Sequence, residues 1–351
     1  MNGNNPTVHS QPPHPAPAHQ YIDSETGEVL TEQLFGDPVI RFVYSELRER
    51  MPWMYRAVTA SRMSHLLGML NFETLLGARL SGQRRWLQNN RIDLAECVEP
   101  PHRLDTPRKV FERKIRYWET RPMPPGDAVI VSPADSRVLI GSLNDHCLFE
   151  IKNKFFEYEE LLAADKPEWL ETFRGGNIAI FRLTPEKYHY NHVPVSGTVL
   201  DAYDIPGRYH SCNPSAVILL VTPYSKNKRS VTILDTDVPG GTGVGRVAMI
   251  EVVALMIGDI LQSYSAEGYD DPQPVTPGMF LKKGQPKSLF RPGSSTTVLL
   301  FEKGRMQFNP RLLFNQRHPW ASSRFSRSFG KPLVETDVKV RSEIGAAWEK
   351  E

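Results

Sequence analysis

Residues 290–302 read FRPGSSTTVLLFE, a Gly-Ser pair that leads directly into a strongly apolar run. The run that starts at Thr296 is short and rich in β-branched and large apolar residues, which predicts a strand. One interpretation of Gly293-Ser294 is a turn, in which glycine supplies unusual backbone angles and serine begins the strand. The other is chemical. Given a base, the Ser294 hydroxyl can attack the carbonyl of Gly293, because glycine has no Cβ to hinder the attack.

Short runs of the same kind recur between Gly, Pro, Asn and Asp turns, and they predict a β-rich body. They lie at residues 128–132, 136–140, 177–183, 197–200, 216–222, 230–235 and 296–302. Residues 242–262 are apolar and mixed, and they fit either a buried strand or a helix. The loose GxGxxA pattern in 240–248 fits a hairpin turn better than a dinucleotide site, since the acidic residue that follows stands at the wrong spacing.

The sequence before residue 100 has a different composition and a different pattern of apolar residues. Residues 1–36 are predicted to be a disordered or extended tail, because their first half is rich in proline and poor in large aliphatic residues. Residues 37–100 predict a helical region that breaks or restarts at Pro52. Apolar residues three and four apart in 53–80, with arginines between them, make an amphipathic helix that either packs on the body or lies at a membrane surface. The expected fold is α+β, a helical N-terminal region followed by a β-rich body over 101–351.

Composition excludes several classes of protein. Lys plus Arg is 42 and Asp plus Glu is 40, a net charge of +2, which argues against nucleic-acid binding through bulk charge. The three cysteines stand far apart, so neither a disulfide framework nor a structural zinc site is expected. The longest apolar-rich stretch, 247–261, contains Glu251 and Asp259 and falls short of the roughly 20 apolar residues of a membrane span.

Two further segments carry candidate chemistry. The segment YHYNHVPVSG (188–197) contains His189 and His192, and SPADSRV (132–138) places Asp135 in a turn before a strand. Taken alone, two satisfied histidines and a turn-capping aspartate are the default interpretation. No other His or Cys cluster supplies ligands for a metal by spacing. Walker A, HExxH and GxSxG motifs are absent from the sequence.

Together and in this order, these segments resemble the phosphatidylserine decarboxylase family, from about Leu104 to Arg305. The resemblance is carried by FERKI (111–115) with RP (121–122), SPADSRV (132–138), YHYNHVPVSGTV (188–199), KG (283–284) and PGSSTTVLLFEKG (292–304). One such motif would be weak evidence. Several in the right order and at suitable spacing are specific.

The resemblance implies a precursor that cleaves itself. Asp135 would orient His192, and His192 would take the proton of Ser294, which attacks the carbonyl of Gly293. The products would be a β chain of residues 1–293 and an α chain of residues 294–351. The α chain would begin with a pyruvoyl group made from Ser294.

The implied cofactor explains the implied enzyme chemistry. The pyruvoyl group would form a Schiff base with the substrate amine and accept the electrons left behind when CO₂ departs, as pyridoxal phosphate does in other enzymes. Neither pyridoxal phosphate nor a metal is therefore expected. The family uses the first histidine of the YHxxH element to protonate Cα, which here is His189.

The sequence leaves the substrate open. The main interpretation is a peripheral protein on the cytoplasmic face of a membrane that converts phosphatidylserine to phosphatidylethanolamine. The alternative is a soluble decarboxylase whose substrate is a free amino acid, aromatic amino acids included. The segment SPADSR, in place of SPADGR, is typical of a branch of the family in which some members act on free amino acids. A non-catalytic binding module is disfavoured by the intact set of Asp135, His189, His192 and Gly293-Ser294. The expected partners are the phospholipid surface and the two chains themselves; a homodimer is left open, and no nucleic acid is expected.

Overall fold

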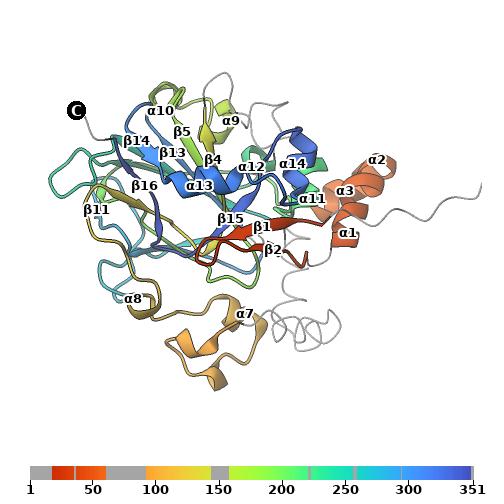
Figure 1. Ribbon diagram of the computed structural model, residues 1–351, viewed down its shortest axis with the longest axis horizontal. Helices are drawn as coiled ribbons and strands as arrows, with labels where there is room; N and C mark the ends of the chain where they lie inside the picture. The colour runs from red at the N-terminus through yellow and green to blue at the C-terminus, as the bar shows by residue number, and fades with distance from the viewer. Residues whose placement is uncertain are drawn as a thin grey trace, which may run out of the picture.

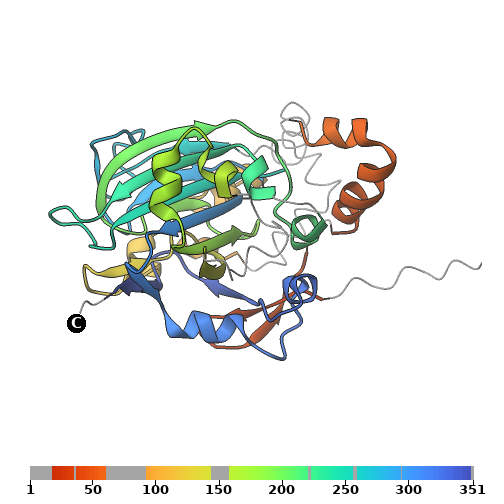
Figure 2. The same ribbon diagram turned by 90° about the horizontal axis from the view of Figure 1, so that it is seen from above.

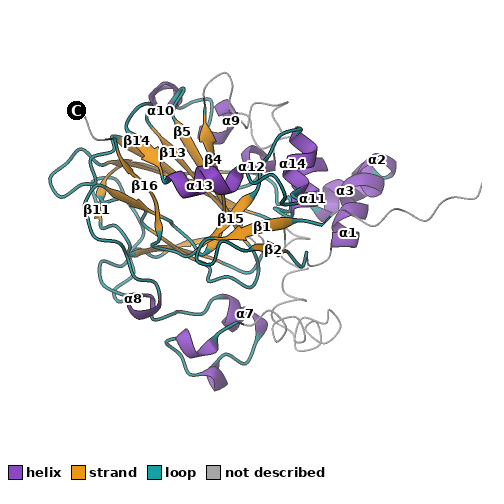
Figure 3. Ribbon diagram, in the orientation of Figure 1, coloured by secondary structure: helices purple, strands orange, loops and turns teal. Residues whose placement is uncertain are grey.

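The apolar run after the Gly-Ser pair forms strand β13 (Ser295–Phe301), around which the rest of the chain is arranged (Figure 1). The computed structural model describes residues 18–34, 37–60, 92–143, 158–219, 223–255, 259–293 and 295–348. Ser294 lies outside these residues, as do residues 61–91, which include 61–80 of the predicted amphipathic helix. Helices and large sheets are mixed along the chain, so the fold class is α+β (Figure 3).

Strand β13 lies inside a ten-stranded sheet, between β5 and β9, and pairs antiparallel with both. The order is β11-β7-β8-β9-β13-β5-β4-β15-β1-β2, and only β1 and β15 are parallel among the described pairs. In chain order, these strands are β1 (Gln20–Asp23), β2 (Val29–Thr31), β4 (Ser136–Ser142), β5 (Asn177–Leu183), β7 (Gly197–Ile205), β8 (Arg229–Asp235), β9 (Arg246–Val253), β11 (Phe280–Leu281), β13 and β15 (Glu335–Val338).

Two three-stranded sheets accompany the large one. The first has the order β10 (Ile260–Gln262), β12 (Pro286–Phe290), β6 (Tyr190–His192); the second has the order β14 (Met306–Phe308), β16 (Glu343–Ala347), β3 (Val129–Val131). Side chains alternate along β13, as a strand requires. Val298 and Leu300 pack into one apolar core, and Leu299 and Phe301 pack into a second core. Both faces of β13 are therefore buried.

Helices cover the first of these cores. Side chains of α9, α10, α11, α12 and α14 complete it, whereas β3, β14, β16 and α13 contribute to the second. The helices are α1 (Asp37–Phe42), η1 (Val43–Leu47), α2 (Arg48–Arg50), α3 (Pro52–Val58), η3 (Leu94–Glu96), η4 (Pro101–Arg103), α7 (Pro107–Phe111), α8 (Tyr117–Thr120), α9 (Tyr158–Leu162), α10 (Pro167–Phe173), α11 (Pro214–Leu219), α12 (Pro223–Lys226), α13 (Pro310–Gln316) and α14 (Arg324–Phe329). Within the described residues, no helix has the length and apolar character needed to cross a membrane.

The N-terminal helices form a group at one end of the body, as Figure 2 shows from above. Tyr44, Leu47 and Tyr55 are buried there and pack with Ala216 of α11. Residues 37–58 form the short helices α1, η1, α2 and α3, the last of which begins at Pro52. The predicted helical region does not continue over 92–100, where the chain forms the short turn η3 and an isolated bridge at Cys97.

One prediction about secondary structure was wrong. Residues 216–222 were expected to form a strand, but 214–219 form α11, and 220–222 lie outside the described residues. The helix forms in place of a strand because Pro214 occupies its first turn and the Asn213 side chain accepts a hydrogen bond from the Ser215 N–H at 2.8 Å. The tail expected over 1–36 contains β1 and β2, which join the large sheet through β15.

The remaining open choice is settled by the structure. Residues 242–262 form strands β9 and β10 rather than a helix. The glycine-rich loop before β9 connects it to β8 as an antiparallel hairpin, which confirms the turn interpretation. The C-terminal residues form no third domain among the described residues, because β15 and β16 lie inside the sheets of the body.

Candidate active site

His192 lies on β6 with its side chain fully buried. Its backbone N–H donates to the carbonyl of Pro133 at 2.7 Å, which ties β6 to the SPADSRV turn. Nδ1 lies 2.8 Å from the carbonyl oxygen of Gly284, and Nε2 lies 2.9 Å from the hydroxyl oxygen of Tyr188. Because a carbonyl can only accept, we assign the ring proton to Nδ1. Nε2 then carries the lone pair that a base needs.

Burial lowers the pKa of His192 to about 3, because a charged ring would lose its hydration. The Gly284 carbonyl and the Asp135 carboxylate act in the opposite direction, while the charges of Arg341 and Arg121 add to the lowering. At neutral pH the ring is therefore uncharged, which is the form required of a general base.

Asp135 lies in the turn before β4, where Arg121 holds its carboxylate. Arg121 donates from Nε to Oδ1 at 3.0 Å and from Nη2 to Oδ2 at 2.8 Å, and the N–H of Val340 donates to Oδ1 at 2.8 Å. Burial alone would raise the pKa of Asp135, but the charge and hydrogen bonds of Arg121 outweigh burial and hold the pKa below its ordinary value. Among the described residues, Asp135 forms no hydrogen bond to His192. It acts on that ring only through space.

His189 is fully buried, and its ring stacks on the ring of Phe111 with centroids 3.5 Å apart. Within the described part of the chain, neither ring nitrogen has a hydrogen-bond partner of good geometry, although the backbone of Lys187 acts to raise its pKa. Burial first, and then the charge of Arg113, lower the pKa of His189 well below its ordinary value. Arg113 also donates to the carbonyls of Lys187 and Glu186, at 3.2 and 3.0 Å, and so fixes the turn that carries His189.

The predicted cleavage point lies where the chain crosses from a small sheet to the large one. Strand β12 ends at Phe290, whose N–H donates to the carbonyl of His189 at 3.1 Å. Gly293 has a φ of 152°, a backbone angle that residues with a Cβ rarely adopt. Ser295 begins β13 and is paired with β5 and β9 on its two sides. Ser294 itself lies outside the described residues, but its neighbour Ser295 is held in the large sheet.

A hydrogen bond joins the start of β13 to the strand of the two histidines. The hydroxyl of Thr297 donates to Oδ1 of Asn191 at 2.8 Å, and Asn191 stands between His189 and His192 in the chain. Strand alternation places the Ser295 side chain on the same face of β13 as Thr297. This hydrogen bond ties β6, which ends at His192, to the start of β13.

Sequence reasoning named Asp135, His189 and His192 but missed the residues that hold them. The missed residues are Phe111, Arg113, Arg121, Tyr188 and Gly284. All five stand in the segments that carry the family resemblance, so the motifs contained them. Their contacts could not be derived from spacing, because each partner lies on a different element.

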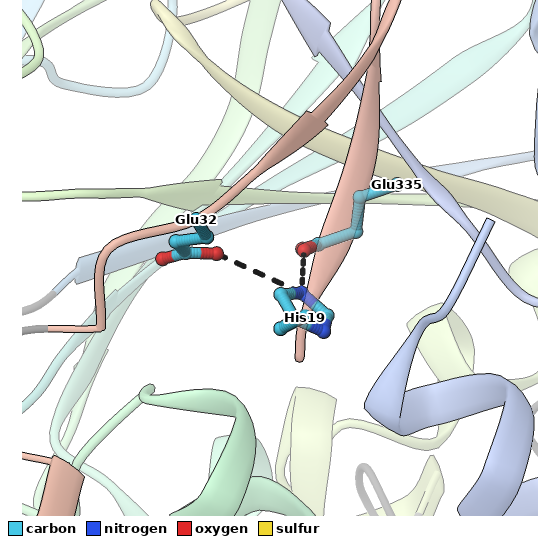
Figure 4. Close-up of side chains that lie close together, drawn as sticks. All are labelled: His19, Glu32 and Glu335. Atoms are coloured by element: carbon cyan, nitrogen blue, oxygen red, sulfur yellow. Dashed lines mark hydrogen bonds and ion pairs between the residues drawn. The ribbon is translucent and has the colours of Figure 1, made fainter. Parts of the chain in front are cut away.

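A second buried cluster joins the N-terminal hairpin to the large sheet. It contains His19 before β1, Glu32 after β2 and Glu335 on β15 (Figure 4). One ligand atom from each lies within 4.8 Å of the others, as in a metal site. However, Arg182 pairs with Glu335 at 2.6 Å and with Glu32 at 2.7 Å, and Arg137 also pairs with Glu32. The arginines already neutralise both carboxylates, so we interpret the cluster as an ion-pair network.

Over most of its length, the chain is similar to proteins that are all named phosphatidylserine decarboxylase proenzyme. The family model described as phosphatidylserine decarboxylase matches residues 108–327. A phosphatidylserine decarboxylase proenzyme of Chlamydia trachomatis is 30% identical over 317 residues, which is 89% of this chain and 96% of the relative. The proenzyme of Fusobacterium nucleatum is 26% identical over 300 residues (85% and 92%), and that of Clostridium tetani is 25% identical over 295 residues (84% and 91%).

An α+β fold with two buried histidines beside a Gly-Ser junction, matched to proteins named as decarboxylases, is that of a carboxy-lyase. The chain belongs to the phosphatidylserine decarboxylase family. The resemblance expected from the motifs is thereby confirmed.

Proposed function

We propose that this protein cleaves itself between Gly293 and Ser294 and then converts phosphatidylserine to phosphatidylethanolamine and CO₂. Membership of the family supports the proposal. The observation that carries it is the pair of buried, uncharged histidines on the segment that Asn191 ties by a hydrogen bond to the strand after the cleavage point. A base and a proton carrier are thereby provided by two separate rings.

For the cleavage step, Nε2 of His192 accepts the proton that Ser294 gives up, and the serine oxygen bonds to the carbonyl carbon of Gly293. The C–N bond between Gly293 and Ser294 then breaks and its nitrogen takes a proton, which leaves an ester. Elimination releases the Gly293 carboxylate and leaves dehydroalanine, which hydrolyses to the pyruvoyl group and ammonia. The unusual backbone angle of Gly293 supports this assignment, since such conformations often occur at reacting bonds. Asp135 remains ionised in its pair with Arg121, and its negative charge favours the protonated ring of His192 through space.

The residues around position 294 fit a pyruvoyl group formed from Ser294. Among the described residues, the Ser295 hydroxyl and both nitrogens of His189 are buried without a hydrogen-bond partner of good geometry. Buried polar atoms are normally paired, so these atoms indicate a group or a substrate that completes them. When formed, the pyruvoyl group supplies the electron sink for decarboxylation. His189, held by Phe111, carries the proton for Cα.

We also propose that residues 37–58 attach the protein to the cytoplasmic face of a membrane as a peripheral protein. One face of this segment packs on the body, as described above. Three large apolar side chains of the same segment, Val39, Phe42 and Trp53, are exposed, with exposed fractions of 64%, 56% and 67%. Exposed arginines accompany them at positions 41, 48, 50 and 56. Apolar side chains beside arginines are typical of a helix that lies in the lipid headgroup region.

Replacing Trp53 with glutamate should reduce binding to phosphatidylserine vesicles by about tenfold, because it exchanges a large inserting ring for a charge that anionic lipids repel. Sedimentation with vesicles measures the bound fraction. Trp320, which is 85% exposed after α13, offers a matched control, and Trp320→Glu should bind as the unaltered protein does. Equal loss in both variants, or in neither, would contradict an attachment through residues 37–58.

Substrate choice is tested by CO₂ release. The cleaved protein should release CO₂ from phosphatidylserine vesicles and not from free serine or tryptophan, because the proposed attachment segment brings the site to lipid. Release from a free amino acid alone would overturn the lipid assignment and support the soluble alternative. If a protein that has cleaved itself releases CO₂ from neither phosphatidylserine, serine nor tryptophan, its substrate is another compound and the lipid assignment is wrong.

A further inference from the structure

The lone-pair nitrogen of His192 is the end of a buried chain of hydroxyl groups. The hydroxyl oxygen of Tyr188 lies 2.9 Å from Nε2 of His192 and 2.7 Å from the hydroxyl oxygen of Tyr269. The Tyr269 hydroxyl oxygen lies within hydrogen-bond distance of both backbone polar groups of Ile115. The Ile115 N–H donates to it at 3.1 Å, and the Ile115 carbonyl accepts from it at 2.9 Å. The Ile115 end of this row of hydroxyl groups therefore offers a hydrogen-bond donor and an acceptor at once.

The hydrogen positions follow uniquely when His192 is neutral. Nδ1–H is taken by the carbonyl of Gly284, so Nε2 must accept, and Tyr188 donates to it. The Tyr188 oxygen then accepts from the hydroxyl of Tyr269, and the Tyr269 oxygen accepts from the N–H of Ile115. Every group in the chain is satisfied.

The same heavy atoms satisfy the protonated ring equally well. Nε2–H now donates to the Tyr188 oxygen, the Tyr188 hydroxyl turns to the Tyr269 oxygen, and the Tyr269 hydroxyl turns to the carbonyl of Ile115. Two hydroxyl hydrogens rotate, and no heavy atom needs to move. An isolated hydroxyl could also reverse, but the Ile115 end is what keeps the second tyrosine paired in both states.

A protonated ring buried this deeply has no water to solvate it, so it needs a hydrogen-bond acceptor from the protein. Burial lowers the pKa of His192, and among the charged groups that act on the ring, Arg121 and Arg341 oppose its protonation while Asp135 favours it. Tyr117 packs its ring edge-to-face on His192 and supplies no counter-charge. Hydrogen bonds to a charged group are roughly twice as strong as those between neutral groups, so a partner that can accept from Nε2–H stabilises the charged ring most.

We infer that Tyr188 and Tyr269 form a reversible hydroxyl relay that solvates His192 in both its neutral and its protonated state; Tyr188 passes the serine proton on to Nε2, and Tyr269 is a positioning residue. The inference rests on the proposed role of His192 as the base. In that step the Ser294 O–H bond breaks, its electron pair bonds to the Gly293 carbonyl carbon, and the π pair of that carbonyl moves to its oxygen. Tyr188, which already donates to Nε2, gives its own proton to Nε2 and takes the serine proton in exchange. The relay lowers the cost of the imidazolium that results.

The rate of self-cleavage tests the relay. Precursor made in a pulse of cell-free synthesis is followed on a denaturing gel. Tyr188→Phe should cleave about 10–100-fold more slowly, as expected for losing a hydrogen bond to a charged group. Tyr269→Phe should cleave about 2–10-fold more slowly, because it removes the second hydroxyl only. Tyr190, which stacks on Tyr188, is the matched control, and Tyr190→Phe should cleave at the unaltered rate. Equal rates for Tyr188→Phe and Tyr190→Phe would overturn the relay.

A spectroscopic arm separates the relay from a loss of folding. In the Ser294→Ala precursor, ¹⁵N NMR of the His192 ring should show a protonated Nδ1 and a hydrogen-bonded Nε2. Adding Tyr188→Phe should move the Nε2 resonance toward that of a free lone pair, whereas adding Tyr190→Phe should leave it in place. An unchanged Nε2 resonance in the first case, or a ring protonated at Nε2 alone, would overturn the inference. Cleavage of the Ser294→Ala precursor would instead overturn the proposed function.

Discussion

Ser294→Ala is expected to leave the protein as one uncut chain of 351 residues, whereas the unaltered protein is expected to separate into residues 1–293 and 294–351. The serine hydroxyl is the proposed nucleophile, and alanine has nothing that can attack the Gly293 carbonyl. Loss of a serine nucleophile costs on the order of 10⁴-fold or more in comparable systems, so no cleavage should be seen over hours. Denaturing gels and intact mass measure the outcome, and the mass of the short chain also reports its pyruvoyl terminus.

The neighbouring serine provides the control. Ser295 is buried, and its hydroxyl has no hydrogen-bond partner of good geometry among the described residues, while its backbone is held by β5 and β9. Ser295→Ala should therefore still be cut at the same bond. If Ser294→Ala separates into two chains, or if Ser295→Ala alone blocks the cut, the nucleophile has been misassigned.

His189→Ala is expected to cut normally and to lose decarboxylation. His192 is the proposed base for the cut, and its contacts with Gly284 and Tyr188 do not involve the His189 side chain. Turnover, in contrast, needs a proton at Cα, and loss of a proton carrier lowers rates by about 10²–10⁴-fold. One preparation serves both measurements: a denaturing gel for the cut and CO₂ release from phosphatidylserine vesicles for turnover.

A second variant checks that the His189 ring itself titrates. The positive charge of Arg113 lowers the pKa of His189, so Arg113→Met should raise it. The limb of the pH–rate profile that reports this ring should then move to higher pH, whichever protonation state is active. An unmoved profile would assign that limb to another group. An uncut His189→Ala chain would show that the roles of His189 and His192 are exchanged.

Much of the sheet could be predicted from local pattern. Six of the seven expected strands exist, because β-branched runs between turn residues suit a strand wherever it pairs. The run at 216–222 failed because Pro214 and Asn213 supply a helix start that the pattern of β-branched residues does not show. Strands β1 and β2 could not be predicted, since they are short and polar and exist through pairing with β15, more than 300 residues away.

The candidate site was predicted as residues and not as contacts. Asp135 was expected on His192, but Arg121 holds it, and buried arginine pairs leave no periodic signal in a sequence. The two tyrosines that reach His192 illustrate the same limit. Tyr188 stands inside a recognised motif, whereas Tyr269 lies 81 residues further along, in a loop between β10 and β11. Only the fold brings the two hydroxyls together.

The placement of the C-terminal strands has a consequence for how the mature protein persists. Strand β13 lies between β5 and β9, β15 lies between β4 and β1, and β16 lies between β14 and β3. With the proposed cut after Gly293, folding has to precede cutting, because β13, β15 and β16 of the short chain would pair with strands of the long one. Before the cut, the C-terminal strands are tethered and meet their partners at a high effective concentration. After it, reassembly becomes a bimolecular search, so the lifetime of the mature enzyme is set by how slowly it unfolds.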